Sequence, residues 1–330
     1  MTHVGLIGLG HWGRNHYKAL LELQNQGVID EITVCDTNEK LLNELQVTDR
    51  VHKVKNWKDV VNNAKIDLID VVTPSPFHFE MTKESLLANK NVLVEKPMGL
   101  DAKECTELIE IENNSSAKIM VGHIFRFHPG VNELKKRITR GDFGSIQQIF
   151  VRRLTLAPPR KDMGVLLALG IHEVDLTCYL LDDMKPDSIF ADLNYFYGDQ
   201  EESAFIIQKF GKTTAYSYES WIDPTGGKLR ELQVIGSKGG AQLNFSVPNK
   251  IKLIQSYLDT SKEQYVAINE GEFEITLDFQ EPLLEELRHF VTASQTKSEF
   301  LANSTIGKRA VEMIDLAFES YKTKKFIEIE

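Results

Sequence analysis

A glycine-rich stretch near the N-terminus has the spacing of a dinucleotide-binding turn. Residues 4–13 read V-G-L-I-G-L-G-H-W-G, so an apolar run leads directly into Gly8, Gly10 and Gly13. Gly8 would permit a tight turn, Gly10 a close approach of the backbone to a pyrophosphate, and Gly13 close packing of a helix on the strand. The amide groups at the start of the following helix would bind the phosphates. A dinucleotide in this turn would also border His11 and Trp12.

An acidic residue follows the next apolar run, at the distance expected of a ribose ligand. The run is Ile32 to Cys35, and Asp36 ends it. A carboxylate there would accept hydrogen bonds from the ribose diol of an adenosine and would repel a 2′-phosphate. The position therefore favours NAD over NADP. A second interpretation, in which Asp36 is the N-cap of a helix that begins near Asn38, also fits the sequence.

Two further stretches carry side chains suited to acid–base chemistry. Lys96 lies in Glu95-Lys96-Pro97, directly after an apolar run. A lysine that is partly desolvated beside a cofactor can exchange a proton near neutral pH, and Glu95 would hold its orientation. His172 and Asp175 lie three positions apart in a predicted helix, so they share a face and Asp175 can fix the tautomer of the imidazole.

Plainer interpretations exist for both stretches. Lys96 could be a surface lysine, and His172 a buried histidine bonded to a carboxylate. Because no second pair of ligands accompanies His172 at a metal-binding spacing, the sequence predicts no metal site.

The elements that must position these residues change character near residue 122. Up to that point apolar strands alternate with amphipathic helices, which is typical of a doubly wound parallel sheet. Ligands of such sheets bind beyond the carboxyl ends of the strands. We therefore expect five separate stretches to meet at one edge, namely 8–13, 36, 73–78, 95–97 and 122–126.

The remainder of the chain predicts a different kind of sheet. Closely spaced alternating runs between residues 188 and 257 indicate a large, mostly antiparallel sheet, with helices near 164–181, 281–293 and 304–324. The fold class is thus α/β, with an N-terminal Rossmann domain at residues 1–122 and a C-terminal α+β domain at 123–330. One face of the open sheet would need cover, either from a helix of the same chain or from further copies in a homodimer or homotetramer. The residues predicted on that face are Phe205, Tyr216, Tyr218 and Trp221.

Composition and charge exclude several classes of protein. The 38 basic and 48 acidic side chains give a formal net charge of −10, and no clustered positive stripe for nucleic acid is visible. No apolar run reaches the roughly 18 residues of a membrane span. The chain enters a predicted strand almost at once, which leaves no room for a signal peptide. Three widely separated cysteines indicate neither disulfides nor zinc, so a cytoplasmic setting is expected.

Taken together, these motifs resemble the glucose-fructose oxidoreductase, inositol dehydrogenase and rhizopine catabolism (Gfo/Idh/MocA) family. The resemblance covers essentially the whole chain and depends on the order of its motifs, which are G-L-G-H-W-G, Asp36, Thr73-Pro74 with His78, Glu95-Lys96-Pro97, Gly122 with Arg126-Phe127 and Pro129, and Gly170-Ile171-His172-x-x-Asp175. Members of this family are NAD(P)-dependent enzymes that mostly oxidise or reduce a secondary alcohol on a sugar, cyclitol or nucleotide sugar.

The resemblance implies a role for each matching residue. Lys96 would transfer the proton and His172 would be its partner at the substrate hydroxyl. Thr73, Pro74, His78 and Glu95 would line the cofactor channel. Guanidinium groups suit substrate oxygens and phosphates, and the candidates, beside His172 and Asp175, are Arg126, Arg153 and Arg160.

One segment points to a branch of the family, and one residue departs from its pattern. Residues 152–170 look most like the nucleotide-sugar branch, typified by oxidation of UDP-N-acetylglucosamine at its 3-hydroxyl. Many relatives carry an aspartate four residues before the histidine, where this chain has Ala168. Ala168 keeps open the alternative of a non-catalytic, NAD-responsive sensor or regulatory protein. A reductase of a non-sugar compound is less consistent with Gly-x-His-x-x-Asp.

Overall fold

The computed structural model describes residues 1–45, 47–225, 227–261 and 263–329. The chain forms two compact units. The first unit comprises Met1–Phe127 and Gln280–Glu312, and the second comprises His128–Phe279 and Met313–Glu330. The division into a Rossmann domain at residues 1–122 and an α+β domain at 123–330 stays a prediction. The first compact unit extends to Phe127 and also includes the segment Gln280–Glu312.

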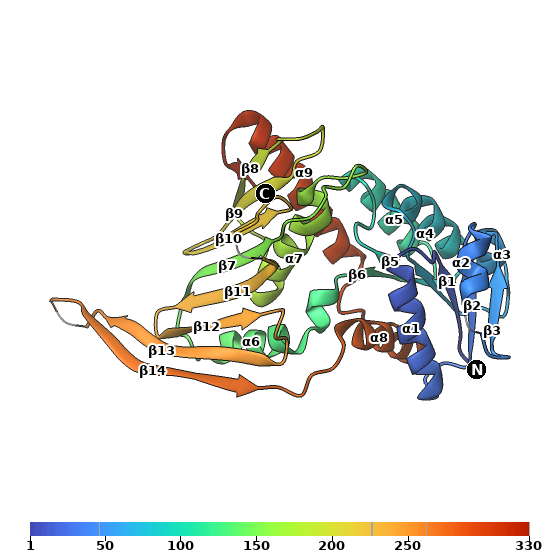
Figure 1. Ribbon diagram of the computed structural model, residues 1–330, viewed down its shortest axis with the longest axis horizontal. Coiled ribbons are helices and arrows are strands. Elements are labelled where there is room, and N and C mark those ends of the chain that lie inside the picture. The colour runs from blue at the N-terminus through green and yellow to red at the C-terminus, as the bar shows by residue number, and fades with distance from the viewer. Residues whose placement is uncertain (46, 226, 262, 330) are drawn as a thin grey trace. The chain divides into compact units, whose positions relative to one another are not determined.

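The first unit contains a six-stranded parallel sheet in the order β3-β2-β1-β4-β5-β6 (Figure 1). Its strands are rich in Val, Ile and Leu and are almost completely buried, as expected of a sheet that is covered on both faces. The predicted doubly wound parallel sheet is confirmed. The strands are β1 (His3–Ile7), β2 (Glu31–Cys35), β3 (Val51–Val54), β4 (Leu68–Val71), β5 (Asn91–Glu95) and β6 (Ile119–Gly122).

Helices of the first unit begin at residues that satisfy their free amide groups. Asn38, Asn56 and Asp101 are N-caps whose side chains accept backbone hydrogen bonds. A helix from the C-terminal part of the chain, α8, packs beside α1, and Leu287 and Phe290 join the same apolar core as Leu20. The helices are α1 (Gly13–Asn25), α2 (Glu39–Glu44), α3 (Trp57–Val61), α4 (His78–Leu87), α5 (Ala102–Asn113) and α8 (Pro282–Thr296).

The second unit contains a nine-stranded sheet in the order β14-β13-β12-β11-β7-β10-β9-β8-β15. Among the described residues, β7 and β10 are the only neighbouring strands of this sheet that run parallel, so the predicted mostly antiparallel sheet is confirmed. The strands are β7 (Ile146–Leu154), β8 (Ser188–Asn194), β9 (Ser203–Phe210), β10 (Thr213–Ser220), β11 (Leu229–Gly236), β12 (Gly239–Asn244), β13 (Lys250–Asp259), β14 (Val266–Thr276) and β15 (Ile327–Glu328). The helices are α6 (Pro129–Arg140), α7 (Ile171–Leu180) and the later part of α9 (Ser304–Thr323).

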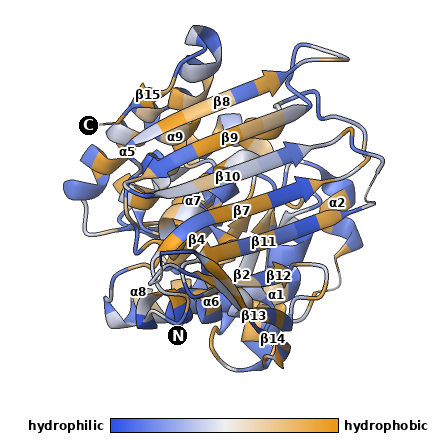
Figure 2. Cartoon of the chain, turned by 90° about the vertical axis from the view of Figure 1, so that its left-hand side faces the viewer, coloured by the Kyte–Doolittle hydropathy of each residue, from blue (hydrophilic) through white to orange (hydrophobic). Residues whose placement is uncertain are grey.

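One face of this sheet is open, and Figure 2 shows it with β8, β9, β10, β7 and β11 side by side toward the viewer. Phe150 and Tyr216 stack there with ring centroids 4.8 Å apart, and Phe205 lies beside Tyr216 and Tyr218. Phe205 is 37% exposed, and the other three are partly buried. The prediction for Trp221 is wrong: it is only 7% exposed, because it follows the end of β10 and its backbone bonds Glu202 and Ala157.

The sequence analysis missed strand β14, which is the edge strand of the sheet beside β13. Its residues are nearly all exposed, and its glutamates interrupt any apolar alternation. Two of them pair across the hairpin, Glu272 with Lys252 at 2.6 Å and Glu274 with Lys250 at 3.3 Å. Charged side chains are common on edge strands because they oppose pairing with other chains.

Among the described residues, no helix has the length and hydropathy that a membrane crossing requires.

Candidate active site

The glycine turn between β1 and α1 is built as its spacing predicts. Gly8 has φ +107°, and a Cβ there would lie 2.4 Å from the carbonyl oxygen of Val72. A Cβ on Gly13 would lie 2.1 Å from the carbonyl oxygen of Gly8. Both positions therefore require glycine. Gly10 differs, since no heavy atom lies within 4 Å of its Cβ direction, and the backbone there is accessible to a ligand.

The start of α1 is suited to an anion. Within the described residues, its N-cap Trp12 makes no side-chain capping bond, and no acidic residue lies in the first turn. The positive end of the helix dipole is thus not neutralised by the chain itself. The turn and the helix start together fit the pyrophosphate of a dinucleotide.

Asp36 joins the end of β2 to the glycine turn. Its Oδ2 accepts a hydrogen bond from the backbone N–H of Leu9 at 2.7 Å, and its Oδ1 accepts one from Asn38 at 2.8 Å. The N-cap of α2 is Asn38, whose side chain accepts from Lys40, so the N-cap interpretation of Asp36 is wrong. The Asp36 carboxylate is half-buried beside the turn, where it fits the ribose diol of a bound NAD.

His78 ties together the segments that follow β4 and β5. Its ring is buried, with Nδ1 2.7 Å from the carbonyl oxygen of Pro97 and Nε2 2.7 Å from that of Thr73. Burial lowers the pKa of His78, and the two backbone hydrogen bonds oppose that shift. Thr73 is half-buried and Pro74 exposed, so these two, rather than the His78 ring, present surface at this edge.

Glu95 ends β5 and contacts both the glycine turn and Lys96. Its Oε1 accepts a hydrogen bond from Nε1 of Trp12 at 2.7 Å, and its Oε2 accepts one from the backbone N–H of Lys96 at 3.2 Å. Burial would raise the pKa of Glu95, but hydrogen bonding and attraction to His16 lower it, so the carboxylate stays ionised. Lys96 is half-buried, and the peptide bond that joins it to Pro97 is cis.

The predicted meeting of five stretches at one edge is confirmed within the first unit. The backbone N–H of Gly8 bonds Cys35 at 2.8 Å, Trp12 bonds Glu95, and a Cβ on Gly122 would lie 2.9 Å from Glu95 Oε1. Arg126 belongs to this unit but lies in its interior. It is fully buried, and its Nη1 donates to the carbonyl oxygen of Leu301 at 3.2 Å.

In the second unit, His172 lies on a helical segment whose start is held by a glutamate. A π-helical turn, Leu166–Gly170, precedes α7 and contains the buried Ala168. The carboxylate of Glu201 accepts a hydrogen bond from the N–H of Leu166 at 3.0 Å. His172 is half-buried in the first turn of α7, whereas Asp175 is buried.

Two of the predicted substrate-binding arginines have partners of their own. Arg153 Nη2 lies 2.7 Å from Oε1 of Glu173, which is fully buried next to His172 in the sequence. Arg160 is exposed, and its Nη2 and Nε lie 2.5 Å and 3.0 Å from the carboxylate of Asp162. Beside Arg153 in the sheet register, Glu219 is also buried, and burial together with the Glu173 charge raises its pKa well above the usual value.

Sequence reasoning missed several buried ionisable residues. A signal was present for some of them, since Asp70 interrupts an apolar strand and His16 lies three residues after the last glycine of the turn. Neither pattern by itself indicates which residue the side chain contacts. The missed residues are His16, Asp70, Glu173, Glu201, Glu219 and Glu286.

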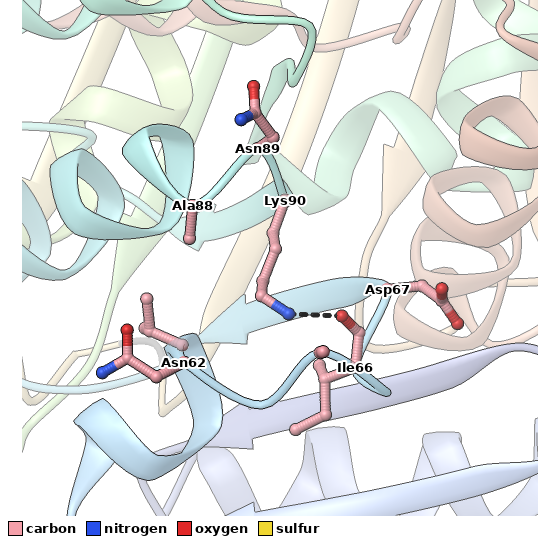
Figure 3. A pocket seen from close by; sticks show the side chains of 8 residues that line it. Asn62, Ile66, Asp67, Ala88, Asn89 and Lys90 are labelled. Atoms are coloured by element: carbon pink, nitrogen blue, oxygen red, sulfur yellow. Dashed lines mark hydrogen bonds between the residues drawn. The ribbon is translucent and has the colours of Figure 1, made fainter.

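Two hollows on the described part of the first unit lie away from the glycine turn. One of about 460 Å³ lies where β4 and β5 begin, and it is lined by residues that include Asn62, Asp67 and Lys90 (Figure 3). Lys90 Nζ donates to the carbonyl oxygens of Asn63 and Ile66 at 2.6 Å and 2.5 Å, so it holds a turn together.

Among the described residues, no group of three or more His, Cys, Asp or Glu side chains is placed to hold a metal ion.

A parallel sheet that places a glycine turn, an aspartate at the end of the second strand and a half-buried lysine at one edge is typical of a dinucleotide-dependent oxidoreductase. Residues 2–123 match the model of an oxidoreductase family with an NAD-binding Rossmann fold, and residues 131–242 match the GFO/IDH/MocA C-terminal domain. The chain belongs to the Gfo/Idh/MocA family. The predictions of the family, the fold class, an oxidoreductase and NAD as its cofactor are confirmed.

The chain is similar to several named proteins. The chain is 32% identical over 197 residues to a UDP-N-acetylglucosamine 3-dehydrogenase of Acidithiobacillus ferrooxidans, a match that spans 58% of each chain. It is 24% identical to an inositol 2-dehydrogenase of Rhizobium meliloti over 98% of each chain. A levoglucosan dehydrogenase in complex with NADH and levoglucosan has the same fold, with a TM-score of 0.84 and 17% identity over 99% of each chain. These names do not favour the alternative of a non-catalytic sensor.

Proposed function

We propose that this protein transfers a hydride between NAD and a secondary hydroxyl of a sugar or nucleotide sugar. The names of its relatives support this substrate class, since they include dehydrogenases of an inositol and of a nucleotide sugar. The observation that carries the proposal is the position of Glu95, whose carboxylate bonds both Trp12 in the glycine turn and the backbone of Lys96. A cofactor on that turn would have Lys96 beside it.

The side chains of this chain would hold the substrate and move its proton. The Lys96 amine would take the proton from the substrate hydroxyl. Bound NAD supplies the hydride acceptor at C4 of the nicotinamide. Asp36 holds the adenosine ribose, and Gly10 and the start of α1 hold the pyrophosphate.

We infer that the substrate is a nucleotide sugar related to UDP-N-acetylglucosamine. The 32% identical relative supports this choice over a free cyclitol. Ala168 supports it too, because the position offers no carboxylate of the kind that many sugar and inositol dehydrogenases carry there. The exposed Arg160 is suited to a diphosphate, since a guanidinium binds phosphate oxygens in pairs.

We also propose that the open sheet face binds a second copy of the chain, in a homodimer or homotetramer in the cytoplasm. The partly exposed aromatic rings of Phe150, Phe205, Tyr216 and Tyr218 support this use of the face. Replacement of Tyr216 by Glu should lower the mass measured by light scattering. An unchanged mass would contradict this surface.

The catalytic proposal is tested by NADH absorbance with a panel of substrates. UDP-N-acetylglucosamine, N-acetylglucosamine, myo-inositol and glucose are each incubated with NAD and the purified protein. We expect NADH to form with the nucleotide sugar, and Lys96→Ala to lower kcat by about 100-fold or more. Lys83→Ala is the matched control, because Lys83 is a partly exposed lysine of the same unit that pairs with Glu107 at 2.8 Å. Silence across the panel together with tight NAD binding, or equal rates in both variants, would overturn the proposal.

A further inference from the structure

His16 is a fully buried ionisable residue near the glycine turn. It lies in the first turn of α1 with its side chain fully buried. Its Nδ1 is 2.8 Å from Oδ2 of Asp70 on β4, and its Nε2 is 3.2 Å from Oε1 of Glu95 at the end of β5. Both ring nitrogens therefore face carboxyl oxygens, and where both acids are ionised only a doubly protonated ring donates to both of them.

The groups around this ring favour the imidazolium. Burial alone would lower the pKa of His16, but the charges of Asp70 and Glu95 and the hydrogen bonds to them raise it to about 10. A further acid, Glu286 on α8, is fully buried, and among the described residues its oxygens have no hydrogen-bond partner. Burial and the charge of Glu95 raise the pKa of Glu286 well above its usual value. The ring nitrogens of His16 thus face Asp70 and Glu95, whereas burial and the charge of Glu95 favour the protonated form of Glu286.

Glu95 connects this buried cation to the surface of the site. The same Oε1 that faces His16 accepts the indole N–H of Trp12, and Oε2 accepts the backbone N–H of Lys96. Gly122 packs so closely that a Cβ there would lie 2.9 Å from this carboxylate, which leaves Glu95 little freedom to rotate. The charge and position of the Glu95 carboxylate therefore affect both Trp12 in the glycine turn and the backbone of Lys96.

We propose that His16 is a positioning residue, which fixes the ionised Glu95 carboxylate so that Trp12 of the cofactor turn and the backbone of Lys96 are held in one arrangement. This inference rests on the proposed function only where it concerns the role of Lys96. Without the His16 cation, the buried Glu95 carboxylate would keep only the charge of Lys96 and the Trp12 hydrogen bond to stabilise it, and it would take up a proton more readily. Trp12 would then lose a charged acceptor and Lys96 its support.

The charge of His16 is measured first, on the wild-type protein and without any cofactor. A nitrogen spectrum of protein labelled at its histidine rings should show one histidine with both ring nitrogens protonated at pH 8, and that signal should be absent in His16→Phe. An unprotonated His16 at pH 8 would overturn the proposal. This measurement holds even where a variant fails to fold.

The link to Trp12 is measured by fluorescence. The contribution of Trp12 is the difference between a protein and the same protein with Trp12→Phe. We expect His16→Phe to change that contribution and His3→Phe to leave it unchanged. His3 is a matched control, since it is buried on β1 of the same unit and bonds Thr33 at 2.8 Å. An unchanged Trp12 contribution in folded His16→Phe would count against the link.

The link to Lys96 is measured by kinetics. We expect kcat to fall about 10- to 100-fold in His16→Phe with little change in the KM of the sugar substrate, because a small displacement of an acid–base group slows chemistry more than binding. His16→Gln keeps one N–H donor toward Glu95 and should recover part of kcat. Normal kcat in both variants would overturn the inference, whereas an inactive wild type would overturn the proposed function and leave the nitrogen spectrum and the fluorescence to decide the link to Trp12.

Discussion

Each of the two units buries acidic side chains around a cation, but the two cations differ in kind. In the first unit the imidazole of His16 lies between Asp70 and Glu95, and Glu286 is the surplus acid. In the second unit the guanidinium of Arg153 pairs with Glu173, and Glu219 is the surplus acid. A guanidinium keeps its charge at every accessible pH, whereas an imidazolium can lose its proton. We therefore expect the first unit to be sensitive to alkaline pH, and the second to depend on the mere presence of its cation.

The largest effect is expected when the cation of the second unit is removed. Arg153→Met leaves Glu173 buried beside an acid instead of a cation, and the free energy of unfolding should fall by about 3–5 kcal/mol. Urea denaturation measures this loss. Arg152→Met is the matched control. Arg152 precedes Arg153 in β7, but its side chain is 43% exposed and pairs with Glu231 at 2.6 Å. That variant should lose about 1 kcal/mol or less. Equal losses of unfolding free energy in the two variants would show that burial does not determine how much each ion pair stabilises the protein.

The next effect concerns the alkaline stability of the first unit. Because the pKa of His16 is raised from 6.5 to about 10, its contribution to stability is complete below pH 6.5 and is lost as the pH rises through about 10. The free energy of unfolding of the wild type should fall over this window by a few kcal/mol in order of magnitude. In His16→Phe this decline should disappear, and in His3→Phe it should remain. A decline that persists in His16→Phe would assign it to other groups.

A smaller effect of opposite sign is expected in the second unit at acid pH. His128 caps α6 as a neutral ring, since its Nδ1 accepts the N–H of Gly130 at 3.1 Å, and burial lowers its pKa to about 4. Its contribution is complete above pH 6.5 and is lost as the pH falls through about 4, in total on the order of 3 kcal/mol. His128→Asn keeps an acceptor for Gly130 without this titration, so its acid limb should be flatter. Unfolding curves between pH 7 and 4 measure the difference, and parallel limbs would contradict it.

The smallest effect on stability is expected at the exposed pair of Arg160 and Asp162. The two side chains are 49% and 55% exposed, so Arg160→Ala should change the free energy of unfolding by about 1 kcal/mol or less. If Arg160 binds the substrate diphosphate, the KM of the nucleotide sugar should nevertheless rise. Thermal unfolding and steady-state kinetics on the same preparation separate the two readouts. Unchanged KM would remove Arg160 from the proposed substrate site.

The parts of the site that could be predicted depend on local spacing. Gly8, Gly10 and Gly13 act within a few residues of one another, so their pattern alone indicates a tight turn and a close helix. Asp36 and Lys96 were found because each directly follows an apolar strand, and parallel strands bring their carboxyl ends to a common edge. The open sheet face was predicted from alternation, which correctly placed Tyr216 and Tyr218.

Other features could not be predicted, because they depend on which residues meet across the fold. The sequence shows that Arg126 is an arginine after a strand, and nothing nearby says that it is buried against Leu301. The prediction for Trp221 was wrong because the alternation of Tyr216 and Tyr218 continues at Ser220, whereas Trp221 follows the end of the strand and its backbone bonds elsewhere. Strand β14 was missed because its glutamates interrupt the alternation of apolar residues by which a strand is found in a sequence. Its pairing with β13 is visible only in the fold.

The sequence by itself determined the parallel sheet, the glycine turn, the position of Asp36 at the end of a strand and the family to which the chain belongs. All of these follow from residues that are close together or from the order of motifs along the chain. Only the tertiary structure decided that His16 lies between Asp70 and Glu95, that Glu95 bonds both Trp12 and Lys96, and that Arg153 pairs with Glu173. The physical reason is that the charge of a buried group is set by its neighbours in space, and these neighbours come from strands and helices far apart in the chain.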